Sequence, residues 1–330
     1  MTTEELTFTA ADGVRLAGTL QLPDGAGPHP AALLIVGSGE VDRDSDHPRL
    51  GLGVTRELAA ALVSAGLASL RFDKRGVGAS SGSFLSTTFD DARQDATAAL
   101  AALRDHPAID ATRTLVIGHS EGAVHATSIA AADDSLAGVG LLAGPAVPGA
   151  ETMRWQAERI LPTLPVVVRG LLRLLRQNPA TAQSKLFARL RNSDEVVLRV
   201  QGRQLNAGWL RGFIDHDPAE ELARVSVPVF ALTGDRDLQV DPDDLGRMRT
   251  LVTGAPLETH RPARINHVLR RTDGDGAPSE YRRQVKAGQP VDAGVLDALS
   301  SWAAARVARV AHQRGTEPTT SSSATSTSRS

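Results

Sequence analysis

The stretch LVIGHSEGAVHATSIAAADD, residues 115–134, joins an apolar run to an alanine-rich run through Gly118, Ser120 and Gly122. An apolar run that ends in glycine is typical of a strand buried on both faces, and the alanine-rich run favours a helix. Glycine accepts the backbone angles that a tight turn requires. We therefore predict a strand–turn–helix unit with a serine at the crest of its turn.

The composition restricts the classes of protein to consider. The chain has 330 residues, of which 41% are hydrophobic, so it can form a full core. A formal net charge of −2 gives no electrostatic reason to expect nucleic acid as a partner. The absence of cysteine excludes disulfides, thiolate catalysis and cysteine metal sites.

Targeting and membrane signals are missing from the sequence. The first residues are acidic and lack the cationic start and apolar core of a secretory signal. The longest apolar span, residues 161–175, is interrupted by prolines and arginines, so we expect no membrane-spanning segment. A cytoplasmic protein is the expectation.

Strands and helices alternate along most of the chain. Residues 4–22 alternate apolar and polar residues around Asp12-Gly13, which predicts a hairpin. The runs that follow, up to residue 147, predict parallel strands with crossover helices, and the alternation resumes at residue 223. We therefore assign residues 1–147 and 223–314 to one α/β core.

The remaining residues fall into two segments. Residues 148–222 show only helical runs such as VVVRGLLRLLRQ, which predicts a helical cap inserted into the core. Residues 315–330, GTEPTTSSSATSTSRS, carry too few apolar residues to order and should form a disordered tail rich in serine and threonine.

Ser120 lies in Gly-His-Ser-Glu-Gly, which fits the G-x-S-x-G pattern of a nucleophile elbow. A serine hydroxyl needs a base and an orienting acid, and in this architecture both follow the serine on loops after strands. The acidic candidates after the strand VPVFALTG are Asp235, Asp237 and Asp241. The later histidine candidates are His260, His267 and His312.

The motifs GSGEVDRD, LRFDKRGVGASSG, GHSEG, GDRDLQV and NHVL occur in the same order as in a known family. With them the chain resembles the α/β-hydrolase superfamily, in the serine esterase and acyl-hydrolase branch related to dienelactone hydrolases and prolyl oligopeptidases. The resemblance implies a mostly parallel central sheet with helices on both faces and an inserted helical cap. It also implies Asp237 as the acid and His267 as the base.

Acyl transfer also needs backbone N–H groups that stabilise the oxyanion. The residue after the serine, Glu121, offers one, and we assign the other to Ser38, with Gly39 as its rival. Relatives often have His-Gly-x in this loop, whereas the present chain has Val36-Gly37-Ser38-Gly39 and lacks the histidine. In the DKRG loop we expect Asp73 and Arg75 to form local ion pairs without a catalytic role.

Other functions fit the sequence less well. Gly37-x-Gly39 after a strand suggests a dinucleotide site, but Asp42 stands where that fingerprint needs a third glycine. His119 and His125 flank the serine without the pattern of a metal site, and we expect neither metal nor cofactor. A non-catalytic binding module with the same fold is a further alternative.

We therefore predict a serine hydrolase that cleaves small-molecule carboxylic esters with small to medium acyl chains through an acyl-enzyme. A thioesterase, lactonase or peptidase would use the same three residues. In the predicted cap, arginines recur on one helical face of VVVRGLLRLLRQ and leucines occupy the others. We expect two of these leucines, Leu171 and Leu175, to line the acyl pocket.

Overall fold

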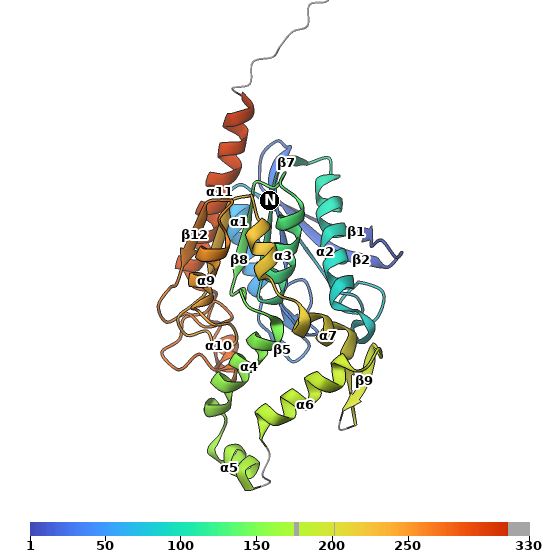
Figure 1. Cartoon of the computed structure of the whole chain (residues 1–330). Helices are drawn as coiled ribbons and strands as arrows, with labels where there is room; N and C mark the ends of the chain where they lie inside the picture. Colours follow the sequence, from blue (N-terminus) through green and yellow to red (C-terminus); the bar gives the residue numbers. More distant parts are fainter. Residues whose placement is uncertain (175–177, 201, 316–330) are drawn as a thin grey trace, which may run out of the picture.

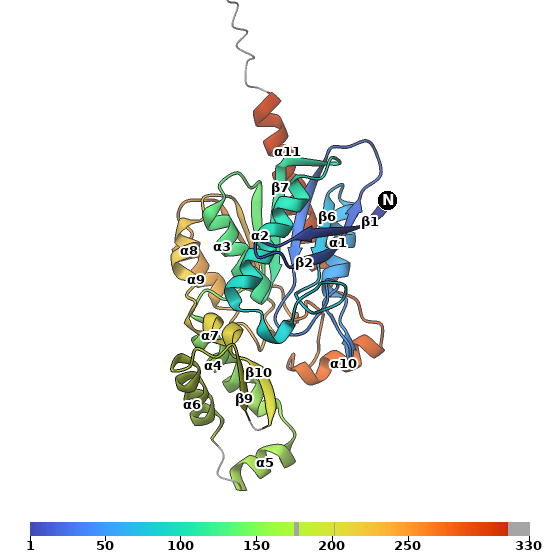
Figure 2. The same ribbon diagram turned by 90° about the vertical axis from the view of Figure 1, so that its right-hand side faces the viewer.

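An eight-stranded, mostly parallel sheet forms the centre of the protein (Figures 1 and 2). The computed structural model describes residues 1–174, 178–200 and 202–315. The strand order is β1-β2-β6-β3-β7-β8-β11-β12; β2 pairs antiparallel with β1 and β6, and all other neighbours pair in parallel. The strands are β1 (Thr2–Thr9), β2 (Arg15–Leu22), β3 (His29–Ile35), β6 (Ala68–Phe72), β7 (Ile109–His119), β8 (Gly138–Leu142), β11 (Val229–Leu232) and β12 (Leu257–His260). A separate two-stranded pair consists of β4 (Asp46–His47) and β5 (Leu50–Gly51).

Two layers of helices cover the two faces of the sheet, as the sequence predicts for this fold class. The helices of the α/β core are α1 (Val54–Ser64), α2 (Phe89–Arg104), α3 (Glu121–Ala132), α9 (Asp244–Leu251), α10 (Pro278–Lys286) and α11 (Ala293–Gly315), with a short turn η1 (Phe84–Ser86). α1 and α11 pack together on one face, and α2 and α3 pack on the other. Helix α2 begins with a capping box between Thr88 and Asp91.

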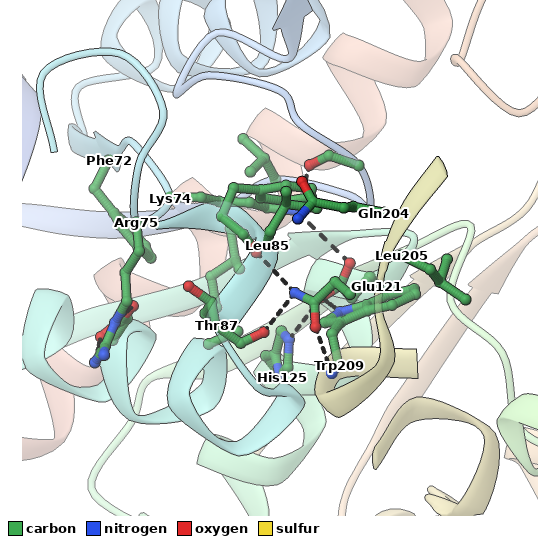
Figure 3. Close-up of a pocket in the computed structure, with 17 residues that line it drawn as sticks. Phe72, Lys74, Arg75, Leu85, Thr87, Glu121, His125, Gln204, Leu205 and Trp209 are labelled. Atoms are coloured by element: carbon green, nitrogen blue, oxygen red, sulfur yellow. Dashed lines mark hydrogen bonds and ion pairs between the residues drawn. The ribbon is translucent and has the colours of Figure 1, made fainter. Parts of the chain in front are cut away.

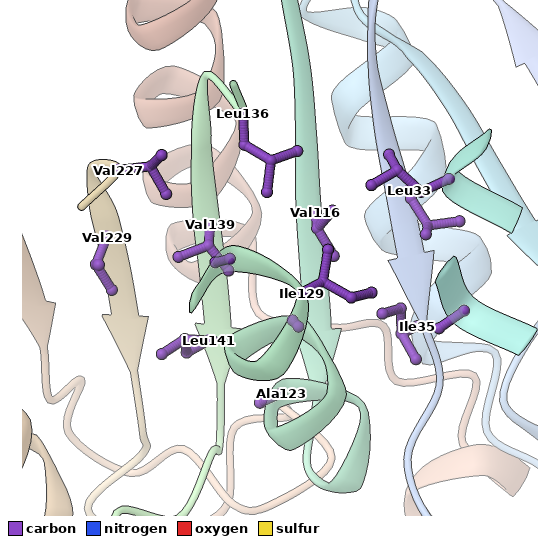
Figure 4. Packing of buried hydrophobic residues seen from close by; sticks show 14 of the residues in the cluster. Leu33, Ile35, Val116, Ala123, Ile129, Leu136, Val139, Leu141, Val227 and Val229 are labelled. Atoms are coloured by element: carbon purple, nitrogen blue, oxygen red, sulfur yellow. The ribbon is translucent and has the colours of Figure 1, made fainter. Parts of the chain in front are cut away.

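The side chains of the central strands alternate between the two hydrophobic clusters. Leu33 and Ile35 belong to the cluster under α2 and α3, whereas Leu34 belongs to the cluster under α1 and α11. Val116 and Ile117 divide in the same way along β7. Figure 4 shows the first cluster, with strand side chains gathered around α3. Because both faces are covered, these strands are continuous apolar runs.

Most of the segment between β8 and β11 lies beyond one end of the sheet, whereas its last helix packs against α3 beside the sheet (Figures 1 and 2). It contains α4 (Gly149–Ile160), η2 (Leu161–Thr163), α5 (Val166–Leu174), α6 (Pro179–Arg191), β9 (Val197–Val200), β10 (Arg203–Asn206), α7 (Ala207–Asp215) and α8 (Ala219–Arg224). The sequence predicted helices alone here, but β9 and β10 form an antiparallel hairpin. Its strands are only four residues long, and the turn passes through Gly202, whose φ is 79°. So short a run gives little period-two signal.

The segment has a small hydrophobic core of its own, distinct from the two clusters of the sheet. Its buried side chains come from α4, α6, α7 and the hairpin: Ala150, Phe187, Leu190, Leu198, Ala207, Leu210 and Ile214. Among the described residues no helix is long and apolar enough to cross a membrane. Residues 316–330, nearly all of the predicted tail, lie outside the described residues.

Candidate active site

Ser120 occupies the sharp turn between β7 and α3, with φ 57° and ψ −119°. The residues two positions before and after Ser120 must be glycine because the backbone passes very close to other backbone atoms there. A Cβ on Gly118 would lie 1.9 Å from the carbonyl oxygen of Gly122, and one on Gly122 would lie 2.2 Å from that of Ile35. The Ser120 amide donates to the carbonyl of Leu142 at 2.8 Å, which fixes the turn to β8.

The structure brings Ser120, His267 and Asp237 into one hydrogen-bonded chain. Nε2 of His267 lies 3.1 Å from Oγ of Ser120, and Nδ1 lies 2.9 Å from Oδ2 of Asp237. His267 and Asp237 are 5% and 2% exposed, so water competes little for either side chain. The carboxylate is fixed from behind, because its Oδ1 accepts the backbone N–H groups of Gln239 at 2.7 Å and Val240 at 2.9 Å.

The other sequence candidates contact different groups. Asp235 accepts the backbone N–H of Arg264 at 2.5 Å and is exposed. Asp241 forms an ion pair with Arg247, and Nε2 of His260 in β12 is hydrogen-bonded to the Glu258 carboxylate at 2.7 Å. His312 belongs to helix α11. The side chain of His312 lies outside the described part of the structure; of the other candidates, hydrogen bonding joins Asp237 and His267, and not Asp235, Asp241 or His260, to Ser120.

His119 holds the loop that carries His267. Its Nε2 lies 2.8 Å from the carbonyl oxygen of His267, and the two imidazole rings lie 5.0 Å apart. Burial, assisted by the neighbouring imidazole of His267, lowers the pKa of His119 to about 4. The ring is therefore neutral near pH 7 and donates an N–H to that carbonyl. Sequence reasoning gave His119 no role.

The two predicted oxyanion donors, Ser38 and Glu121, line one cavity together with Ser120. This cavity of about 140 Å³ is called the serine cavity below. The inserted segment closes it with Thr152, Met153, Gln156, Trp209 and Phe213. The rival donor, Gly39, lines a second cavity of about 250 Å³ instead, called the apolar cavity (Figure 3).

A cluster of polar side chains lines the apolar cavity (Figure 3), and two of its members, Glu121 and Trp209, also line the serine cavity. The carboxylate of Glu121 lies 3.6 Å from the ammonium group of Lys74 and accepts from Nε1 of Trp209 at 2.7 Å and Nε2 of His125 at 3.2 Å. Burial acts to raise the pKa of Glu121, but Lys74 and these donors outweigh it and bring the pKa to about 2. Burial lowers the pKa of Lys74, and Glu121 offsets part of that effect. Glu121 is therefore a carboxylate near pH 7.

The residues on either side of Lys74 form the expected ion pairs, but with distant partners. Asp73 pairs with Arg43 at 2.7 Å. Arg75 pairs with Asp95 at 2.7 Å and with Asp12 at 2.5 Å. The pairs join this loop to the N-terminal hairpin and to α2, so they stabilise more than the loop itself.

Of the two leucines expected to line the acyl pocket, the structure describes the backbone position of only one. Leu171 belongs to helix α5, and Leu175 lies outside the described residues. Their contact with a substrate stays a prediction. The inserted segment does reach the site elsewhere: Gln156 of α4 donates to Gln239 at 3.1 Å, next to Asp237, and Trp209 of α7 donates to Glu121. Neither Gln156 nor Trp209 could be identified from the sequence, because such contacts depend on how the segment docks.

Comparison with known proteins agrees with this fold. Residues 52–268 match the family model described as serine aminopeptidase, S33. The chain belongs to this family. It is an α/β hydrolase of the esterase branch, as the motifs in the sequence predicted.

One characterised relative is an esterase. The chain is 28% identical over 291 residues to esterase EstD of Thermotoga maritima, a match that covers 87% of this chain and 65% of that protein. The chain thus spans slightly less than two thirds of the length of that relative.

Solved structures share the fold at lower sequence identity. DcsB in complex with a substrate analogue has a TM-score of 0.60 at 16% identity, covering 93% of this chain and 100% of DcsB. Est1E of Butyrivibrio proteoclasticus has a TM-score of 0.57 at 17% identity, covering 86% and 98%. The esterase Pf2001 of Pyrococcus furiosus has a TM-score of 0.56 at 15% identity, covering 93% and 92%. At such identities these likenesses show the fold alone.

Proposed function

We propose that the protein is a serine hydrolase that cleaves carboxylic esters of small to medium acyl chain through an acyl-enzyme. The observation that carries this proposal is the hydrogen-bonded chain from Ser120 through His267 to Asp237. Ser120 Oγ attacks the ester carbonyl while His267 Nε2 takes its proton. His267 then returns the proton to the departing alcohol, and the acyl group stays on Ser120.

Water then hydrolyses the acyl-enzyme with the help of the same side chains and amides. His267 takes a proton from a water molecule, whose oxygen attacks the acyl carbonyl, and the proton returns to Ser120 as the acid leaves. Asp237 keeps the proton of His267 on Nδ1, so Nε2 is free to accept. In both steps the amides of Ser38 and Glu121 stabilise the oxyanion. Because Ser38 shares the serine cavity and Gly39 does not, we favour Ser38 as the second donor.

The serine cavity supports a small to medium acyl group. An engineered apolar cavity of about 150 Å³ is known to hold benzene, so a cavity of about 140 Å³ suits a group of similar size. We propose that the inserted segment acts as a cap, since five of its side chains close this cavity.

Peptide hydrolysis is the second candidate, because the family model carries the description of an aminopeptidase. An aminopeptidase must bind the free ammonium group of its substrate, and a carboxylate is the usual partner for such a group. Of the described residues that line the serine cavity, only Glu121 is a carboxylate, and it is already paired with Lys74. This favours esters over N-terminal peptides.

A substrate panel tests the proposal. We expect hydrolysis of p-nitrophenyl acetate and butyrate, weaker hydrolysis of the matching thioesters and lactones, and little release from aminoacyl p-nitroanilides. A fluorophosphonate should label the wild-type protein and not Ser120→Ala. Faster turnover of the anilides than of the esters would replace the esterase with a peptidase. Absence of labelling together with absence of turnover would favour a non-catalytic module.

A further inference from the structure

The oxyanion loop, Gly37–Gly39, has a single side chain able to hydrogen-bond, that of Ser38, which is exposed, and two of the loop's carbonyl groups are bound from outside. Nζ of Lys74 donates to the carbonyl oxygen of Gly37 at 2.5 Å and to that of Gly39 at 3.2 Å. These carbonyls flank Ser38, whose amide is the second proposed oxyanion donor. Two of the three loop residues are glycine, so the free backbone would sample many conformations.

Because the peptide bond is planar, the contact of Lys74 with the Gly37 carbonyl also fixes the direction of the Ser38 N–H. The carbonyl of Gly37 and the N–H of Ser38 belong to the same peptide group, in which a trans bond makes them point opposite ways. Holding the Gly37 oxygen on Lys74 therefore turns the Ser38 N–H away from Lys74. Lys74 lines the apolar cavity, whereas Ser38 lines the serine cavity together with Ser120, which fits an N–H that faces the serine cavity.

Glu121, whose backbone amide is the first proposed oxyanion donor, holds Lys74 in place through its side chain. Its carboxylate lies 3.6 Å from Nζ and is held by Trp209 and His125. The ion pair between Lys74 and Glu121 thus connects the two proposed oxyanion donors: Glu121 carries one donor amide, and Lys74 binds the carbonyl groups on either side of the other, Ser38. Glu121 is buried, and keeping such a charge pair out of water costs free energy that an apolar pair would not. Orientation of the loop explains why the pair is present.

We propose that Lys74 and Glu121 are positioning residues that hold the oxyanion loop in its active conformation, in place of the histidine that relatives carry there. This inference rests on the proposed function, because it concerns the same reaction. Neither side chain touches the reacting atoms, and both act through the backbone of the loop.

The experiment compares Lys74→Met with Lys185→Met and Lys74→Arg. Lys185 is exposed on α6 and serves as the matched control for the same chemical change. Removing a single oxyanion donor usually lowers kcat about 10²–10³-fold, so a loosened donor in Lys74→Met should lower kcat about 10–100-fold with KM within about twofold. Lys74→Arg should recover most of the loss, and Lys185→Met should behave as wild type.

A transition-state readout separates orientation from simple destabilisation. A trifluoromethyl ketone forms a tetrahedral adduct with an oxyanion, so its Ki should rise in Lys74→Met by the same factor by which kcat/KM falls. If Lys74→Met does not fold, Glu121→Gln, which removes the charge and keeps the shape, takes its place. Wild-type kcat in the folded variant, or a fall in kcat with unchanged Ki, would overturn the proposal. An unlabelled, inactive wild type would instead refute the proposed function.

The two cavities carry a second, independent inference. Both are lined by Trp209 and Glu121, which therefore form the wall between them. Beyond that wall the apolar cavity is lined by Phe72, Phe84, Leu85 and Leu205, and it is larger than the serine cavity. We infer that Trp209 limits the acyl chain to the serine cavity, and that its removal opens the apolar cavity to longer chains.

The test is the ratio of kcat/KM for p-nitrophenyl octanoate to that for butyrate. Each additional buried methylene contributes about 0.8 kcal/mol, or about fourfold, so Trp209→Ala should raise the ratio at least about tenfold. Trp209→Phe, which keeps the ring and loses the N–H, should leave the ratio unchanged. Leu205→Ala, which enlarges the apolar cavity behind an intact wall, should do the same.

Two results would refute the role of Trp209. One is an unchanged ratio in a folded Trp209→Ala that still cleaves butyrate. The other is an equal rise in Trp209→Phe, which would assign the effect to the hydrogen bond with Glu121. If Trp209→Ala does not fold, Trp209→Leu gives the same comparison with a smaller change in volume.

Discussion

Replacing Asp237 by asparagine changes one atom and should remove the proton acceptor of the site. Oδ1 of Asp237 accepts the backbone N–H groups of Gln239 and Val240, so the carbonyl oxygen of the new amide stays there. Its NH2 group then takes the place of Oδ2, 2.9 Å from Nδ1 of His267. An NH2 group only donates, so the closest partner of Nδ1 is no longer an acceptor, and the longer contact of Nδ1 with Oδ1, at 3.1 Å, is left to hold the ring proton. The change therefore favours the tautomer with the proton on Nε2, in which Nε2, 3.1 Å from Ser120 Oγ, cannot take the serine proton.

The expected loss is about 10³–10⁴-fold in kcat, as for the equivalent change in serine proteases. This corresponds to about 4–5.5 kcal/mol of transition-state stabilisation. KM should change little, because no group that contacts the substrate is removed. The melting temperature should also stay close to that of the wild type, since the side-chain volume and both backbone hydrogen bonds remain.

The assay is steady-state hydrolysis of p-nitrophenyl butyrate by folded variants. Asp235→Asn is the matched control, because Asp235 lies two residues away, binds the amide of Arg264 and does not reach His267. We expect Asp235→Asn within about threefold of the wild-type kcat. An Asp237→Asn variant that keeps more than about a tenth of the activity, or a more damaged Asp235→Asn, would refute the tautomer argument.

Burial lowers the pKa of His119 to about 4, whereas the pKa of a histidine in the unfolded chain is about 6.5, so the unfolded state binds a proton first as the pH falls. The free energy of unfolding should therefore fall by about 3 kcal/mol between pH 6.5 and 4. Urea titrations of His119→Gln should show a smaller fall over the same pH range. Leu171→Ser with Leu175→Ser should raise KM for longer esters more than for acetate; an equal rise would assign these leucines to packing. Deleting residues 316–330 should change neither melting temperature nor turnover, and a clear loss of stability would contradict the sequence argument.

The parts of the fold that the sequence predicted are those with local signals. The N-terminal hairpin, the strand–turn–helix unit at Ser120 and the return to the core after the insertion all follow from periodicity and glycine placement. Asp237 could not be separated from Asp235 in this way, because both occupy an acidic loop. The resemblance to a family made that choice, and the hydrogen bonds of the loop give its physical reason.

The contacts that the sequence could not predict are those made between distant segments. In the sequence, Lys74 lies between Asp73 and Arg75 and has no signal that distinguishes it from a surface lysine; its contacts with the oxyanion loop arise only when the end of β6 lies beside that loop. Trp209 is an ordinary apolar residue of α7 until the inserted segment docks over Glu121. His119 directly precedes Ser120 in the sequence motif, but its role could not be predicted, because its hydrogen bond to the carbonyl of His267 joins residues 148 positions apart.

Trapping of the acyl-enzyme tests the central claim most directly. The wild-type protein is mixed with p-nitrophenyl butyrate, quenched in acid during turnover, digested and examined by mass spectrometry, with Ser120→Ala treated in parallel. We expect one butyryl group on the peptide that contains Ser120 and none on that peptide in Ser120→Ala, which should also lose turnover. Steady turnover by Ser120→Ala, or a butyryl group on a different residue of the wild type, would contradict the assignment of Ser120 as the nucleophile.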